Sequence, residues 1–74
     1  MRECKIRLDI DAAAEFVQKA SKCDFDIDIF YNRFIVDAKS ILGVLGLDFS
    51  QVLTVQYGGS NDDFDKMLKR LAVA

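Results

Sequence analysis

The sequence contains no histidine, no proline and no tryptophan, and it has only two cysteines among 74 residues. Histidine is the commonest general base near neutral pH and a frequent zinc ligand, so its absence removes both roles. Cys4 and Cys23 do not form a close pair, and no secretory signal accompanies them, so we expect free thiols rather than a disulfide. The sequence therefore predicts no metal site and no cofactor.

Positive charge is not in excess, because ten Lys and Arg stand against twelve Asp and Glu, for a formal net charge of −2. This balance argues against a generic nucleic-acid surface. The longest apolar run is far too short to span a bilayer, and no apolar stretch follows a basic amino-terminal region. We expect a cytoplasmic protein that binds neither nucleic acid nor membrane.

Hydrophobic residues are abundant at 51%, and six of them are Phe. A chain of this length builds one small core, so we expect a single domain over residues 1–74. Alternation of apolar and polar residues predicts strands at 3–8, 24–31, 34–38 and 52–57.

Helical spacing predicts three helices between these strands. The first covers 9–22, the second is short and runs from a Ser40 cap to about Gly46, and the third begins at Ser60. Asp63 lies three residues after Ser60, as in a capping box. The order predicts an α+β fold, a four-stranded antiparallel sheet with three helices on one face.

The second predicted strand carries Asp24, Asp26 and Asp28 on one face. A calcium loop needs a turn from which several ligands converge, and this alternating run offers none. We interpret the three aspartates as a solvated sheet face rather than a cation site.

The stretch "VDAKSILGVLGLDFSQVLTV", residues 36–55, resembles the regulatory serine segment of the HPr family, the histidine-containing phosphocarriers of the bacterial sugar phosphotransferase system. "AAEFVQKASKCDFDIDI", residues 13–29, is similar to the first helix and second strand of that family. The resemblance implies the HPr-like open-faced β-sandwich, with the order β-α-β-β-α-β-α.

The resemblance also implies a phosphorylatable His and a nearby Arg where the first helix begins. Alignment on Phe16 and Val17 puts these at about Asp9 and Asp11, so the chain lacks the active-site His. A helix amino-terminus attracts phosphate, whereas two carboxylates there bind the free N–H groups and repel an incoming phosphoryl group. We expect no enzyme activity and no catalytic residue. Phosphorylation of Asp9 or Asp11 itself is disfavoured, since no Lys or acidic metal site is evident around them.

Ser40 corresponds to the serine that a dedicated kinase phosphorylates in the family, although a plain helix cap would also need only a Ser. Ile41, Leu42 and Leu45 correspond to the apolar patch through which family members bind partner proteins. The alternatives are core packing or a homodimer contact.

We therefore predict a regulatory or protein-interaction module of the phosphotransferase system, whose partner is a kinase, a transcriptional regulator or another phosphotransferase-system protein. A relative that carries Gln at the His position is a precedent for a role that depends on serine alone. The alternative is a stand-alone structural or oligomerising domain that has the same fold and no role in that system.

Overall fold

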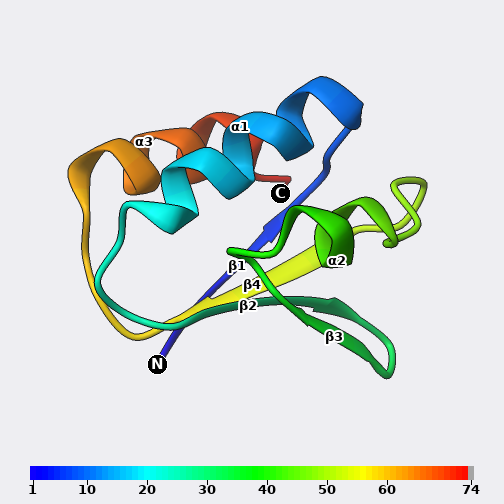
Figure 1. Cartoon of the computed structure of the whole chain (residues 1–74), viewed down its shortest axis with the longest axis horizontal. Helices are drawn as coiled ribbons and strands as arrows, with labels where there is room; N and C mark the ends of the chain where they lie inside the picture. Colours follow the sequence, from blue (N-terminus) through cyan, green and yellow to red (C-terminus); the bar gives the residue numbers. More distant parts are fainter. Residues whose placement is uncertain (74) are drawn as a thin grey trace.

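A computed structural model describes residues 1–73, and its strands and helices follow the order expected from the sequence (Figure 1). In chain order they are β1 (Arg2–Ile6), α1 (Ile10–Ser21), β2 (Ile27–Tyr31), β3 (Phe34–Asp37), α2 (Ile41–Leu45), β4 (Leu53–Tyr57) and α3 (Asp62–Leu71). The strands form one antiparallel sheet in the order β1-β4-β2-β3. The predicted α+β class and element order are confirmed.

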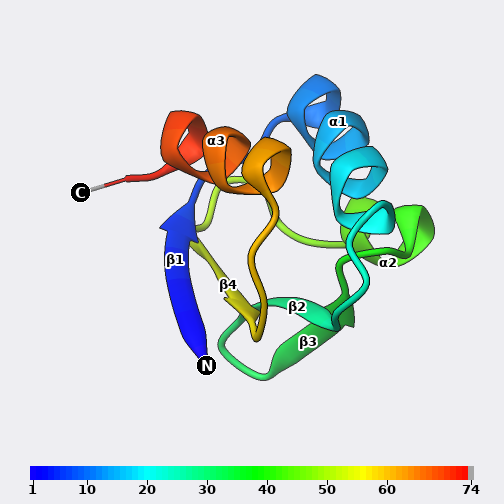
Figure 2. The same cartoon turned by 90° about the vertical axis from the view of Figure 1, so that its left-hand side faces the viewer.

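All three helices lie on one side of the sheet, and the other side is open (Figure 2). Alternate residues of the central strands face the helices because side chains alternate across a strand. Ile27 and Ile29 of β2 and Leu53 and Val55 of β4 are all buried.

Phe64 of α3 lies at the centre of an aromatic cluster in this core. The centroid of its ring is 6.0 Å from that of Phe16 on α1 and 5.6 Å from that of Tyr57 on β4. The Phe25 ring approaches edge-on at 6.4 Å. These contacts join both long helices to the sheet, so the helix layer and the sheet share one core.

The second strand is shorter than the predicted span 24–31, because β2 begins only at Ile27. Asp24 and Asp26 therefore precede the strand, and the prediction of three aspartates along one strand face is wrong for these two. The connection from α1 instead directs the Phe25 ring towards Gly59. A Cβ on Gly59 would lie only 2.2 Å from the Phe25 ring, so the closeness of these segments requires glycine.

The cap of α3 is Asn61 rather than the predicted Ser60. The Asn61 side chain accepts a hydrogen bond from the N–H of Phe64 at 3.1 Å. The Ser60 hydroxyl donates to the carboxylate of Asp65 at 2.9 Å, so the predicted capping box with Asp63 does not form. Asn and Ser cap helices about equally well, and the burial of Phe64 fixes the helix start one residue later.

The remaining boundaries move by one or two residues. β1 ends at Ile6, β3 ends at Asp37 and β4 begins at Leu53. Cys4 and Cys23 are free thiols, as expected, and burial raises the pKa of both. None of the helices within residues 1–73 is both long and apolar enough to cross a membrane.

Candidate functional site

The first candidate site is the amino-terminus of α1. Asp9 is the N-cap, with extended backbone at φ −117° and ψ −175°. Its carboxylate accepts a hydrogen bond from the N–H of Ala12 at 2.7 Å, and its carbonyl accepts one from Ala13 at 2.8 Å. A negative charge is favourable here because it meets the positive end of the helix dipole. Asp9 thus already occupies the place where an incoming anion would bind.

Asp11 adds a second exposed carboxylate in the first turn of the same helix. Arg7, on the preceding segment, donates from Nη2 to the carbonyl of Ser50 at 3.0 Å. This contact holds the guanidinium against the connection between α2 and β4. Asp9 and Asp11 thus both lie at the start of α1, Asp9 as its N-cap and Asp11 as a negative charge in its first turn.

The second candidate site is the start of α2. Ser40 is the N-cap, and its hydroxyl oxygen accepts a hydrogen bond from the N–H of Gly43 at 3.2 Å. Ser40 is exposed. α2 ends at Leu45, with Gly46 as the C-cap, so the predicted extent of this helix is confirmed.

α2 lies close to the sheet at Gly43. A Cβ at this position would come within 3.3 Å of both the Ser40 hydroxyl and Cβ of Val36 on β3. A side chain there would press on the cap and on the sheet together. Gly43 thus permits a short helix to pack closely in spite of its low helix propensity.

An exposed apolar surface, the α2 patch, consists of Ile41, Leu42 and Leu45. Their exposed fractions are 41%, 81% and 44%. Val44, in the same helix, is completely buried. The density of apolar residues in this segment exceeds what one helix face can direct inward, so the remainder meets solvent. Core packing, one of the alternatives left by the sequence, is therefore wrong for these three residues.

Lys39, just before α2, makes a contact to the end of α1 that no sequence pattern indicated. Its Nζ donates to the carbonyl of Cys23 at 2.9 Å, just beyond the carboxyl end of α1. This contact ties the segment before α2 to the carboxyl end of α1, whereas Asp9 caps the amino end. Among residues 1–73, no hydrogen bond joins Ser40 to Asp9 or Asp11.

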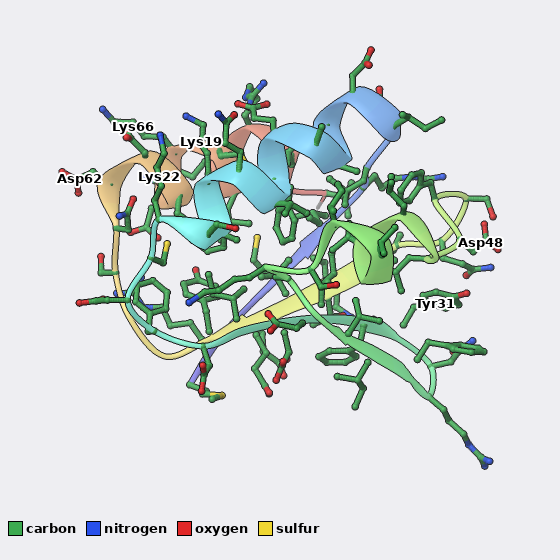
Figure 3. All side chains as sticks on the ribbon, viewed as in Figure 1. Lys19, Lys22, Tyr31, Asp48, Asp62 and Lys66 are labelled. Carbon is green, nitrogen blue, oxygen red and sulfur yellow. The ribbon has the colours of Figure 1, made fainter. Side chains whose placement is uncertain are left out.

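Hydrogen bonds lower the pKa of two exposed carboxylates near these sites. The hydroxyl and N–H of Ser50 donate to Asp48, in the connection after α2, and these bonds lower the pKa of Asp48 (Figure 3). On the helix layer, Nη2 of Arg70 donates to both oxygens of Glu15 at 2.6 Å, and this hydrogen bonding lowers the pKa of Glu15. Both pairs are exposed; the first stabilises a turn within one connection, and the second joins α1 to α3.

The part of the chain that the structure describes contains no pocket. Groups of three or more His, Cys, Asp or Glu that could hold a metal ion are also absent from residues 1–73. The surfaces available for function in this part are thus a capped helix end, an exposed serine and an apolar patch.

The family model described as "PTS HPr component phosphorylation site" matches residues 4–74. The chain belongs to the HPr family.

Solved structures agree with this assignment. The chain is 33% identical to HPr-C-His from Thermoanaerobacter tengcongensis, with a TM-score of 0.76 over 97% of this chain and 91% of that one. It is 29% identical to the phosphocarrier protein HPr from Bacillus anthracis str. Ames, with a TM-score of 0.65 over 96% of this chain and 89% of that one.

Proposed function

We propose that this protein is a regulatory or protein-interaction member of the HPr family that does not carry a phosphoryl group on histidine. The observation that supports this proposal is the sequence itself, since none of its 74 residues is His. We assign the family's His position to Asp9 and its Arg position to Asp11. We propose that the protein acts in the bacterial cytoplasm, in the regulation of sugar transport.

The chemistry of the α1 terminus supports the proposal. An imidazole there could accept a phosphoryl group while the helix N–H groups and an Arg neutralise its charge. The carboxylate of Asp9 instead accepts the N–H of Ala12, and Asp11 adds charge of the same sign. A phosphoryl group on the carboxylate of Asp9 would compete with this cap and place more negative charge beside Asp11.

The start of α2 is the working surface that we propose in its place. Ser40 is exposed, and the α2 patch begins with the next residue. We propose that a kinase of the HPr-kinase type phosphorylates Ser40 and that a partner protein binds the patch. A phosphate dianion on Ser40 would lie at the positive end of α2 and next to the apolar surface, so it would alter docking at that surface directly.

The proposal is tested first with enzyme I and phosphoenolpyruvate. We expect no acid-labile phosphorylation of the wild-type protein, whereas an HPr with its active-site His is labelled in the same reaction. The double variant Asp9→His, Asp11→Arg tests our register, because it restores both family side chains at one helix end. Labelling of the wild type would refute the proposal, and labelling of the double variant alone would support it.

The second test uses an HPr kinase, ATP and variants of Ser40. Ser40→Asn removes the hydroxyl that would be phosphorylated but keeps a good helix cap, so labelling should vanish while stability is retained. Ser40→Ala removes the hydroxyl and the cap together. Ser60→Ala is the matched control, since Ser60 is also exposed and its loss should leave labelling intact. Equal labelling of wild type and Ser40→Asn would exclude Ser40 as the phosphorylation site.

The alternative function is a stand-alone structural domain that oligomerises through the α2 patch. The 81% exposure of Leu42 is the observation that favours it. Leu42→Glu would then convert an oligomer into a monomer, and the kinase would label neither protein. Under the regulatory proposal Leu42→Glu weakens partner binding without changing the mass of the free protein.

A further inference from the structure

The two edge strands of the sheet, β1 and β3, differ in how far other segments cover their outer edges. The outer edge of β1 is partly covered by the segment after α3, because the N–H of Val73 donates to the carbonyl of Lys5 at 2.9 Å and Ile6 forms a bridge with Ala72. The other edge is β3, and within residues 1–73 its only strand partner is β2. Figure 2 shows β3 at the rim of the sheet, away from β1. β3 is thus the edge that this part of the chain leaves open.

The register of the β2–β3 hairpin shows which backbone groups this edge offers. The N–H of Ala38 donates to the carbonyl of Ile27 at 2.9 Å, so Ala38 belongs to a hydrogen-bonded pair. Hydrogen-bonded and non-hydrogen-bonded pairs alternate in an antiparallel ladder. Ile35 and Asp37 are therefore the residues whose backbone groups point away from β2. The carbonyl of Asp37 accepts the N–H of Ser40 at 3.0 Å, which agrees with this direction and leaves Ile35 as the centre of the open edge.

The side chains on this edge are large and apolar. Phe34 is 64% exposed and Ile35 is 65% exposed. Proteins usually protect an open edge with charges, proline or a bulge, and an exposed apolar edge is a template for another strand. The ring centroids of Phe34 and Tyr31 are 5.5 Å apart at the end of the hairpin, and Figure 3 shows Tyr31 on the opposite side of the view from Lys19 and Lys66.

The charges on β3 identify the strand that fits. Asp37 lies opposite Asp28 in the ladder, and neither carboxylate forms an ion pair with any residue in 1–73. Arg33 lies two residues before Ile35 and Asp37 two residues after it, so the stretch is self-complementary. In an antiparallel pair of two such strands centred on Ile35, each Arg33 faces Asp37 of the other copy. Cross-strand pairs of opposite charge stabilise a ladder, whereas like charges destabilise it.

We propose that β3 pairs with β3 of a second copy of this chain, antiparallel and centred on Ile35, to form a continuous eight-stranded sheet. The two Ile35 residues form a hydrogen-bonded pair, in which each N–H donates to the carbonyl of the other, and their side chains pack on the open face. The Arg33 of each copy pairs with Asp37 of the other and offsets part of the negative charge that Asp37 and Asp28 share. The register also places Phe34 opposite Val36 on the helix side.

This dimer involves neither Ser40 nor the α2 patch, so it does not rest on the proposed function. A dimer through the α2 patch and a dimer through β3 make opposite predictions for variants of each surface. Leu42→Glu would abolish the first, and Ile35→Lys would abolish the second.

Sedimentation velocity from micromolar to millimolar protein tests the proposal. We expect wild type to shift from monomer to dimer with concentration, and Ile35→Lys to weaken the dimer by about tenfold or more, because two Lys would lie directly opposite one another. Thr54→Lys is the matched control, since it adds the same charge on the open face of central β4 and should leave the dimer intact. Leu42→Glu should also leave it intact.

Two further measurements test whether the backbone of Ile35 forms hydrogen bonds across the dimer. Ile35→Pro removes the N–H that points away from β2 and no hydrogen bond inside the monomer, so it should abolish the dimer while the protein stays folded. In wild type, exchange of the Ile35 amide should slow as the protein concentration rises. A wild type that stays monomeric at millimolar concentration, or a dimer that Leu42→Glu removes and Ile35→Lys does not, would overturn the proposal.

Discussion

Replacing Asp9 with alanine separates its role as a helix cap from any role in phosphate chemistry. The substitution removes the acceptor for the N–H of Ala12, which lies 2.7 Å from the carboxylate. Loss of a side-chain cap costs about 1 kcal/mol of unfolding free energy. Loss of the negative charge at the helix end costs roughly another 0.5 kcal/mol. We therefore expect Asp9→Ala to lower the free energy of unfolding by about 1.5 kcal/mol.

For a domain of this size, that loss corresponds to a fall in the melting temperature of roughly 6–12 °C. Asp9→Asn is the informative control, because the amide oxygen still accepts the N–H of Ala12 while the charge is lost. It should cost only about 0.5 kcal/mol, and this difference should shrink at high salt, which screens the interaction with the helix dipole.

Urea unfolding followed by far-ultraviolet circular dichroism measures both variants, since the chain has no Trp for fluorescence. A free energy of unfolding for Asp9→Ala within about 0.3 kcal/mol of wild type would contradict the capping role of Asp9, because a cap should exceed that value. Equal destabilisation by Asn and Ala would also contradict it, because the hydrogen bond would then contribute nothing.

Three further predictions concern the core and the ion pair between the long helices. Gly59→Ala should lower the free energy of unfolding by about 1–3 kcal/mol, because its Cβ would overlap the Phe25 ring, and urea unfolding of the double variant with Phe25→Leu should show partial recovery. Val44→Ala should cost about 2 kcal/mol in the same assay, because this side chain is completely buried under α2; a change near zero would contradict that packing. The hydrogen bonds from Arg70 lower the pKa of Glu15, so their contribution to stability is present above the usual value of 4.5 and is lost as the pH falls through the lower folded pKa. Glu15→Gln should therefore flatten the decline in melting temperature below pH 4.5, and an unchanged acid slope would argue against this pair.

The features that could be predicted from the sequence depend on local signals. The caps at Asp9 and Ser40 follow from short polar side chains placed just before an apolar helical pattern, and both are observed. Val44 and Leu42 have similar hydrophobicity but differ in burial, since Val44 is fully buried and Leu42 is 81% exposed. The patch that the resemblance implied at Ile41, Leu42 and Leu45 is exposed, because a helix of five residues cannot direct all its apolar side chains inward.

The errors arise where tertiary contacts override local patterns. Asp24 and Asp26 alternate with apolar residues as a strand would, but Phe25 packs against Phe64 and Gly59, and these contacts keep the chain out of the sheet until Ile27. The contact from Lys39 to the carbonyl of Cys23, and the open edge at β3, depend on elements that are distant in the sequence. No local signal indicated either of them.

The position of β4 between β1 and β2 determines how the protein can assemble. β2 and β3 form a hairpin of neighbouring residues, whereas Cys4 of β1 lies opposite Val55 of β4, far along the chain. The pairing of β4 with β1 and β2 therefore needs contacts between residues far apart in the sequence. We expect this pairing to be the slow step in folding. A chain divided within the connection before β4 would leave a gap one strand wide between β1 and β2. The separate carboxyl-terminal piece, which carries β4, would fill that gap, so the two fragments should complement each other.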